Sequence, residues 1–305
     1  MEKILQQALE YGKQYTPIGK VASYIPELHK SSQSDLGIYI KTLDGKGYGV
    51  GAYDKKFTIQ SISKVIVLTL ALMDKGCEKV FKKVGVEATG DPFNSIVRLE
   101  LKHLQKPLNP MINAGAIATT SLIHGKNGTE QILRILEFAK LLSDNPEVDI
   151  NQEVYESEIK TGDRNRSLAY FMKSSGVIEG DVESLIEVYF KQCSIEMTCQ
   201  DLARIGAIYS NNGLCPKTHR QLIPKTICRM VMAIMTTCGL YDASGEFAVR
   251  VGIPAKSGVG GGILAAVPNK LGIGVYGPAL DEKGNSVGGV EMLAYLADRL
   301  DLSIF

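Results

Sequence analysis

The stretch FTIQSISKVIVLTLALMDKG, residues 57–76, decides the fold because it places a serine three residues before a lysine at the start of an apolar helix. The run Val65–Met73 is apolar at all but one position, which suits a helix buried in a globular core. It is too short to cross a bilayer, which requires about 20 residues. We expect the helix to begin near Ser61 and to end at Gly76.

Ser61 and Lys64 would share one face of this helix, because residues three apart lie about one turn apart. The helix dipole and burial would both disfavour a charged lysine there and lower the pKa of Lys64. A neutral lysine can accept the proton of a serine hydroxyl, so the spacing indicates a Ser-Lys nucleophile pair. Since S-x-x-K is common by chance, a capping Ser61 beside a solvated Lys64 is the alternative.

The composition excludes several classes of protein. The chain has 305 residues, of which 45% are hydrophobic and 22% charged, as in ordinary soluble globular proteins. Its net charge of +1, without a basic block, argues against a nucleic-acid partner. Residues 1–15 read as an amphipathic helix rather than a secretory signal, and no segment is long enough to span a membrane. We therefore expect a cytoplasmic protein with no membrane partner.

The cysteines and histidines do not predict a metal site. None of the six cysteines belongs to a C-x-x-C pair, and the four histidines are scattered along the chain. Most cysteines stand among apolar residues and are predicted to be buried free thiols. We expect neither a metal nor an organic cofactor.

Alternating segments near both ends of the chain predict strands. Residues 35–45 and 47–54 read as one hairpin, residues 261–278 as a second, and residues 286–300 as a final helix. The segments between the hairpins have helical periodicity. We expect an α+β fold, in which an antiparallel sheet is flanked by helices and interrupted by an all-helical insertion.

We expect a single domain over residues 1–305. A sheet subdomain would comprise about residues 1–60 and 245–305, and a helical subdomain about residues 61–244. This order of elements is that of the serine β-lactamases and penicillin-binding proteins, which also carry S-D-N or Y-x-N and K-T-G elements.

Literal copies of these two elements occur at Ser143–Asn145 and Lys160–Gly162, but they are too close together and do not lie on a predicted strand. The segment PAKSGVGGGILAAV is a better counterpart of K-T-G. Its Lys256–Gly258 enters a predicted strand where the edge of the sheet is expected, and its glycines allow close approach of the backbone to a ligand.

With these elements in place, the sequence resembles the serine-dependent glutaminases, the bacterial relatives of the kidney and liver enzymes. The resemblance implies the β-lactamase-like fold, hydrolysis of L-glutamine to L-glutamate and ammonia without a metal or cofactor, and a homodimer or homotetramer. It extends over about residues 10–300, and eight ordered segments carry it: GKVASYIPEL, FTIQSISKV, NPMINAGAI, VYESE, DRNRSLAYFMKS, VYFKQCSI, TTCGLYDASGEFA and PAKSGVGGGILAAVP.

The resemblance also implies roles for individual residues. Ser61 would be the nucleophile and Lys64 its activating neighbour, and a tyrosine would pass a proton to the departing ammonia. The N–H groups of Ser61 and Val259 would hold the oxyanion, and Glu158 would pair with the substrate ammonium. Substrate contacts beyond Ser61 are expected at Tyr24, Asn113, Glu158, Asn165, Tyr189, Tyr241 and Val259, with Tyr189 and Tyr241 as the candidates for proton transfer.

Two other functions compete with this one. A penicillin-interactive acylase would have the same fold, but the chain lacks a correctly placed S-D-N and a secretion signal. A non-catalytic amino-acid sensor would have no need of a lysine in a dry site beside Ser61. Release of ammonia from glutamine separates the three functions.

Overall fold

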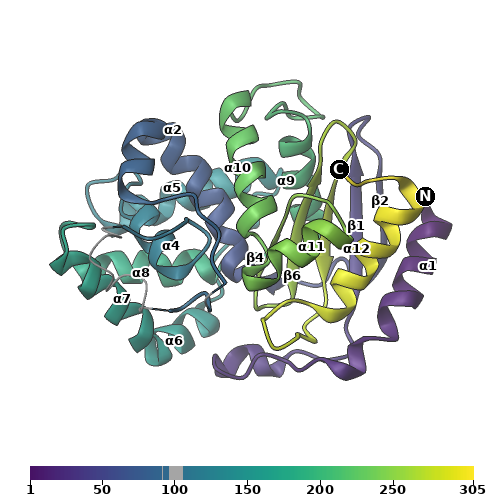
Figure 1. Ribbon diagram of the computed structural model, residues 1–305, viewed down its shortest axis with the longest axis horizontal. Helices are drawn as coiled ribbons and strands as arrows, with labels where there is room; N and C mark the ends of the chain where they lie inside the picture. The colour runs from purple at the N-terminus through teal and green to yellow at the C-terminus, as the bar shows by residue number, and fades with distance from the viewer. Residues whose placement is uncertain (91, 96–105) are drawn as a thin grey trace.

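A five-stranded antiparallel sheet forms the core of the computed structural model, which describes residues 1–90, 92–95 and 106–305 (Figure 1). The strand order is β2-β1-β7-β6-β5, so the first and last hairpins of the chain lie next to each other. The strands are β1 (Gly37–Thr42), β2 (Gly47–Gly51), β5 (Ala255–Ser257), β6 (Gly262–Val267) and β7 (Leu271–Tyr276).

The predicted pairing of the two ends of the chain is confirmed. β1 forms a hairpin with β2 and pairs on its other side with β7, where Ile40 lies opposite Ile273. β6 and β7 form the second hairpin, and β5, which carries Lys256, is the edge strand as expected. The architecture is the predicted α+β fold.

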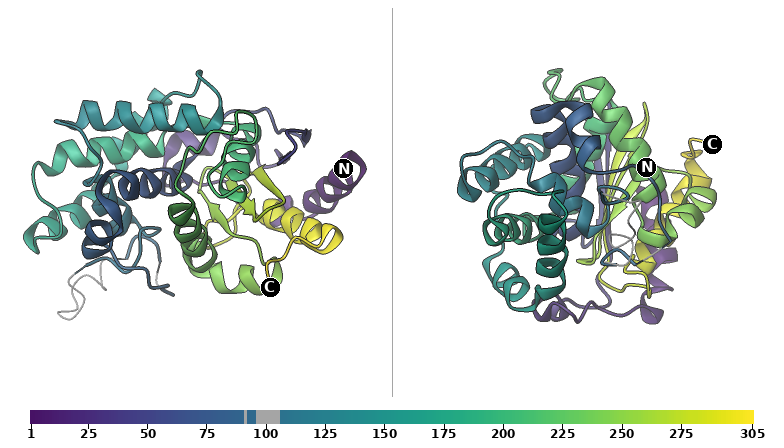
Figure 2. Two further views of the ribbon diagram at one scale, coloured as in Figure 1. Left: turned by 90° about the horizontal axis from the view of Figure 1, so that it is seen from above. Right: turned by 60° about the vertical axis from the view of Figure 1, so that its left-hand side comes forward.

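Helices cover both faces of this sheet (Figures 1 and 2). On one face lie α1 (Glu2–Lys13), α11 (Ser244–Arg250) and α12 (Val287–Leu300), whose apolar residues form one core cluster with Ile38 and Val275 of the sheet. On the other face lies α9 (Cys199–Ser210). A Cβ at Gly272 would stand only 2.1 Å from the backbone nitrogen of Ala207, so glycine allows α9 to pack directly on β7.

Further helices form a block beside the sheet (Figure 2). A short pair of strands, β3 (Phe57–Thr58) and β4 (Glu196–Met197), joins this block to the chain that enters α2. None of the helices in the described ranges is long and apolar enough to cross a membrane. The block contains α2 (Ser63–Lys83), α4 (Asn113–Thr120), α5 (Gly128–Ser143), α6 (Gln152–Thr161), α7 (Asp163–Ser174) and α8 (Val182–Cys193), and α10 (Lys225–Cys238) packs against α2.

The helix predicted near residues 61–76 differs from expectation at both ends. The α-helical hydrogen bonding begins at Ser63, and Ser61 lies one step earlier, in the 3-10 turn η3 (Gln60–Ile62). Gly76 has non-helical angles, φ 77° and ψ 160°, but the chain resumes a helix after it and continues to Lys83. The glycine therefore kinks α2 instead of ending it, because the segment after it carries Val80, which is fully buried.

Candidate active site

One cavity of about 130 Å³ collects most of the residues predicted to be functional. It lies where η3, the start of α4, the ends of α6 and α8, and the turn between β5 and β6 meet. Lys64 and Tyr241 stand directly behind its wall. Seven of the nine predicted residues line it: Tyr24, Ser61, Asn113, Glu158, Asn165, Tyr189 and Val259.

Lys64 is buried, with 1% of its surface exposed, and its amine is held by two acceptors. Nζ donates to the carbonyl of Met111 at 3.2 Å and to Oδ1 of Asn113 at 2.7 Å. Burial lowers the pKa of Lys64 to about 8, although the negative charge of Glu158 acts in the opposite direction. A neutral amine that donates both of its N–H groups in this way keeps its lone pair free to accept a proton.

An asparagine connects this amine to the cavity. Asn113 accepts from Lys64 through Oδ1 and donates through Nδ2 to Oδ1 of Asn165 at 2.9 Å. The oxygen and the nitrogen of the Asn113 side-chain amide each have a partner, so the orientation of the amide is fixed. The acceptor of Asn165 is used in this contact, which leaves its Nδ2 group to donate toward a ligand in the cavity.

Glu158 presents an unpaired carboxylate oxygen to the cavity. Its side chain is 5% exposed, and Oε1 is buried without a hydrogen-bond partner in the part of the chain that is described. Burial raises the pKa of Glu158 to about 8, against the opposite effects of Gln60 and Lys64. A buried carboxylate without a partner is costly, and a ligand ammonium would remove that cost.

Three tyrosines surround the same space. Burial raises the pKa values of Tyr24, Tyr189 and Tyr241, so each phenol keeps its proton and can donate a hydrogen bond. Ser61 and the backbone of Val259 act to lower the pKa of Tyr241, so its hydroxyl lies near Ser61. Tyr24 is 54% exposed and lines the cavity.

Backbone strain is concentrated at this site. A positive φ is tolerated by Asn, Asp and His and is unfavourable for other residues with a side chain. Two described residues outside this tolerated group have a positive φ: Gln60, with φ 47°, and Tyr241, with φ 56°. Gln60 directly precedes Ser61 in the chain, and Tyr241 lies near it in space. Such strain often marks functional sites. The remaining non-glycine residues with positive φ are Asp144, Asn212, His219, Asn269 and Asp301.

The glycine-rich turn between β5 and β6 packs directly on the backbone of residues 58–61. A Cβ at Gly258 would lie 2.6 Å from the carbonyl oxygen of Ile59, and a Cβ at Gly260 would lie 2.3 Å from that of Thr58. Both distances are impossible for a real side chain. The glycines therefore allow the backbone of Val259 to lie beside that of Ser61, as an oxyanion hole built from these two N–H groups requires.

Lys256, the lysine of the predicted K-T-G counterpart, lies outside the cavity and packs against a residue next to it. It is fully buried, and its Nζ donates to the carbonyls of Gly239 at 2.9 Å and Ser257 at 2.6 Å. The same nitrogen lies 4.3 Å from the ring centroid of Tyr241. Lys256 therefore contacts Tyr241 and does not line the cavity with the described residues that form it.

Neither literal copy of the S-D-N and K-T-G motifs lies on a strand, as the sequence predicted. Ser143–Asn145 stands at the end of α5, outside the lining of this cavity. Lys160–Gly162 ends α6, yet Thr161 and Gly162 contribute to the wall.

Several lining residues were missed by the sequence analysis. Gln60 and Arg164 are adjacent to the predicted residues Ser61 and Asn165, and Cys193 lies one helical turn after Tyr189, so their positions could have been considered. Phe93 had no such signal. Its ring packs against that of Tyr241 with centroids 4.9 Å apart, a contact that depends on the tertiary structure alone.

No group of three or more His, Cys, Asp and Glu side chains suited to a metal ion occurs among residues 1–90, 92–95 and 106–305. The site is built from hydroxyl, amide, amine and carboxyl groups. Together these groups can supply a nucleophile, a proton acceptor, proton donors and a partner for a ligand ammonium.

Comparison with known proteins agrees with this chemistry. A family model described as Glutaminase matches residues 19–305. Glutaminase 2 of Clostridium perfringens (strain 13 / Type A) is 58% identical over 305 residues, which cover 100% of both chains. The structure of the probable glutaminase ybaS has a TM-score of 0.94 at 42% identity, covering 100% of this chain and 99% of that one.

A further similar structure carries a covalent ligand. It is the complex between the Bacillus subtilis glutaminase YbgJ and 5-oxo-L-norleucine, formed by reaction of that protein with 6-diazo-5-oxo-L-norleucine. Its TM-score is 0.90 at 40% identity, and the match covers 100% of this chain and 99% of that chain.

Proposed function

The chain belongs to the glutaminase family, whose members hydrolyse L-glutamine to L-glutamate and ammonia, and we propose that it does so through an acyl-enzyme formed on Ser61 and activated by Lys64. The observation that carries this proposal is the buried Lys64 amine, which donates to Met111 and Asn113 and so keeps its lone pair free. The covalent complex of the Bacillus subtilis relative supports a nucleophile in that protein.

The first half of the reaction forms the ester. The Ser61 hydroxyl oxygen attacks the side-chain amide carbon of glutamine while Lys64 takes the hydroxyl proton. The N–H groups of Ser61 and Val259 stabilise the oxyanion. The buried Tyr241 hydroxyl, which lies near Ser61, gives a proton to the amide nitrogen, and the C–N bond breaks to release ammonia. Tyr189 is the second candidate for this proton transfer.

The second half reverses these roles with water. A water molecule attacks the ester carbon and gives its proton to the Tyr241 phenolate, and the bond to Ser61 Oγ breaks as Lys64 returns to that oxygen the proton it took in the first half. Glutamate then leaves, and the enzyme is regenerated without any change of oxidation state.

Polar groups at the other end of the cavity would hold the amino-acid portion. Glu158 pairs with the substrate ammonium, which gives its unpaired Oε1 a partner. Asn165 Nδ2 donates to the carboxylate, while Asn113 holds both Asn165 and Lys64. The Tyr24 and Tyr189 hydroxyls complete the wall between these groups.

A trapping experiment tests the nucleophile. Treatment with 6-diazo-5-oxo-L-norleucine should add one 5-oxo-norleucine group to the peptide containing Ser61, detected by mass spectrometry. Ser61→Ala should not be labelled and should lose turnover by at least about a thousandfold, while its melting temperature stays near that of the wild type. Labelling of the alanine variant, or its near-normal release of ammonia from glutamine, would show that another group attacks.

We propose a cytoplasmic homodimer or homotetramer made of one domain, with the sheet and helical subdomains divided near residues 60 and 245. All six cysteines are unpaired, and four of them are buried, which suits a reducing compartment. Light scattering of the purified chain at several concentrations would give its oligomeric state.

A further inference from the structure

A second and larger cavity, of about 520 Å³, lies away from the active site. It is formed by the turn between β1 and β2, the C-terminal end of α5, the outer part of α9 and residues 215–222. None of the described residues that line it also lines the active-site cavity. The second cavity therefore has its own set of groups.

The lining carries an excess of positive charge. It contains four basic side chains and two carboxylates, so two positive charges are not balanced within it. Asp144 is already paired with Lys217 at 2.6 Å, and Asp44 with Lys46 at 2.8 Å. The four basic residues are Lys41, Arg204, Lys217 and Arg220.

Two of these cations are incompletely paired. Lys41 donates to the carbonyl of Gly45, and burial together with the charge of Arg204 lowers its pKa, as expected for a cation that lacks an anion. Arg220 is exposed, and its guanidinium has no ion pair or hydrogen bond within the described residues. Both cations are therefore available to an added anion.

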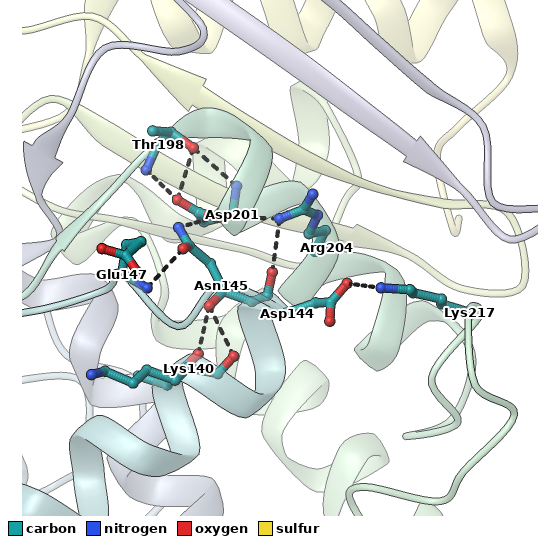
Figure 3. Close-up of polar contacts among 10 residues, drawn as sticks. Lys140, Asp144, Asn145, Glu147, Thr198, Asp201, Arg204 and Lys217 are labelled. Carbon is teal, nitrogen blue, oxygen red and sulfur yellow. Dashed lines mark hydrogen bonds and ion pairs between the residues drawn. The ribbon is translucent and has the colours of Figure 1, made fainter.

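The end of α5 holds the other two cations in place (Figure 3). Arg204 reaches from α9 to the carbonyl of Ser143 at 3.1 Å and forms an ion pair with Asp201 at 3.6 Å, and Lys217 reaches Asp144. Asn145 donates to Asp201 of α9 at 3.1 Å. The literal SDN sequence, Ser143–Asn145, thus forms hydrogen bonds or ion pairs with α9 and with Lys217. These contacts fix one wall of the second cavity.

The floor of this cavity is apolar. Leu142, Ala207 and Ile208 are buried beneath it, and Leu222 is partly buried beside them. Small-molecule sites commonly combine such a floor with a few charged groups that fix orientation. Inorganic anions would leave the apolar part of this space uncovered.

We propose that the second cavity binds a small organic dianion, whose charged group contacts Lys41 and Arg220 and whose apolar body covers Leu142 and Ile208. A phosphate monoester has a charge of about −1.5 to −2 near pH 7, which matches the unbalanced charge of the lining. A dicarboxylate has the same charge. Basic side chains bind both groups through charge-assisted hydrogen bonds.

Calorimetric titration of the full chain with phenyl phosphate, phthalate and inorganic phosphate tests this proposal. We expect saturable binding with one site per chain for at least one of the two aromatic dianions, and the one that binds tells phosphate from carboxylate recognition. Inorganic phosphate should bind more weakly. Equal binding of inorganic phosphate would overturn the role of the apolar floor, and no saturable binding of either aromatic dianion would overturn the site.

Charge-neutral variants locate the binding. Lys41→Gln combined with Arg220→Gln should weaken binding by about tenfold, because two charge-assisted contacts are lost. The matched control is Lys79→Gln with Arg229→Gln, which removes one exposed lysine and one exposed arginine outside this cavity. Equal affinity of the two double variants would refute the assigned contacts.

Two further measurements separate this site from the active site. Ser61→Ala should bind the aromatic dianion as tightly as the wild type, and loss of binding in that variant would place the ligand in the active site. Cys215 lines the second cavity, and although burial acts to raise its pKa, Thr218 lowers it below the usual value. A bound dianion should therefore slow iodoacetamide labelling of the Cys215 peptide, and an unchanged rate would contradict binding at this position.

Discussion

At the scale of single residues, two buried groups determine how the proposed site depends on protons. Lys64 and Glu158 both have pKa values near 8, because burial disfavours the charged form of each. Their titrations are coupled, since each charge favours ionisation of the other. The working form requires a neutral Lys64 and an ionised Glu158, and this form has lost a proton from both groups.

Activity should therefore rise with pH. We expect kcat/KM for glutamine to increase through about pH 8, because deprotonation of either group moves the pair toward the working form. Lys64→Arg should lose nearly all activity over the whole range, since arginine stays protonated. Steady-state ammonia release between pH 6 and 9 measures both effects, and an active arginine variant would show that Lys64 is not the base.

Glu158→Gln should weaken substrate binding and strengthen the fold. Loss of the charge-assisted contact should raise KM for glutamine by about 10- to 100-fold. The folded-state pKa of Glu158 is raised above the unfolded value of 4.5, so its ionisation lowers the free energy of unfolding between about pH 4.5 and 8. Each unit of raised pKa costs about 1.4 kcal/mol.

The glutamine variant lacks this cost. Its melting temperature should exceed that of the wild type at pH 8 and approach it near pH 4.5. Glu156→Gln, an exposed neighbour on α6, is the matched control and should change neither KM nor the melting temperature. A Glu158→Gln variant with unchanged KM would contradict the proposed ammonium contact.

The sequence predicted some residue environments better than others. The apolar residues on both sides of Lys64 indicated its burial, and its 1% exposure confirms it. The contacts of Phe93 and Lys256 with the Tyr241 ring could not be predicted. They join segments that are far apart in the chain, and no local pattern reports such a contact.

At the scale of elements, the glycine-rich turn between β5 and β6 sets the distance between the sheet and the nucleophile. Gly258→Ala should reduce kcat by at least about tenfold, because its Cβ would clash with the Ile59 carbonyl and displace the Val259 N–H from the oxyanion position. The displacement should also lower the melting temperature. Both quantities can be measured on the same purified variant.

Gly245→Ala provides the control for that substitution. Gly245 lies inside α11, and no atom stands within 4 Å of its added Cβ. Alanine there should leave kcat unchanged and stabilise the fold by about 0.5–1 kcal/mol, since glycine is unfavourable within a helix. If the alanines at positions 258 and 245 had the same effect on kcat, the turn would not position the oxyanion site.

Elements with a strong local pattern were predicted correctly. The alternating residues of β1 and β2, and of β6 and β7, indicated both hairpins, and both are confirmed. The start of α2 at Ser63 instead of Ser61 was missed because the strained Gln60 holds the preceding turn in a 3-10 form. The packing of α9 on β7 was also missed, since it depends on the absence of a side chain at Gly272.

At the scale of the whole molecule, the active-site cavity is a junction between the sheet and the helical block. The turn after β5 contributes Val259, while α6 and α7 contribute Glu158 and Asn165. The sequence showed only the order of these three residues along the chain. The eight segments that resemble the glutaminase family predicted that they share one site. The fold makes the distance between the two ends of the cavity a fixed quantity.

That fixed distance predicts selectivity for side-chain length. If Glu158 and Asn165 hold the ammonium and carboxylate, and Ser61 is fixed in the 3-10 turn before α2, the cavity measures the distance from the α-carbon to the amide. The amide carbon of asparagine would stop about 1.3 Å short, roughly the rise of one bond in an extended chain. A misplacement near 1 Å can cost about 100-fold in rate.

We therefore expect kcat/KM for L-asparagine to be at least about 100-fold below that for L-glutamine, and little activity on D-glutamine, whose ammonium and carboxylate exchange positions. Ammonia release from the three amides at equal concentration gives these ratios. Loss of the Glu158 contact should reduce the discrimination, because the α-carbon is then held less firmly and asparagine can shift toward Ser61. Equal cleavage of asparagine and glutamine by the wild type would mean that the two ends of the cavity do not act together as this geometry requires.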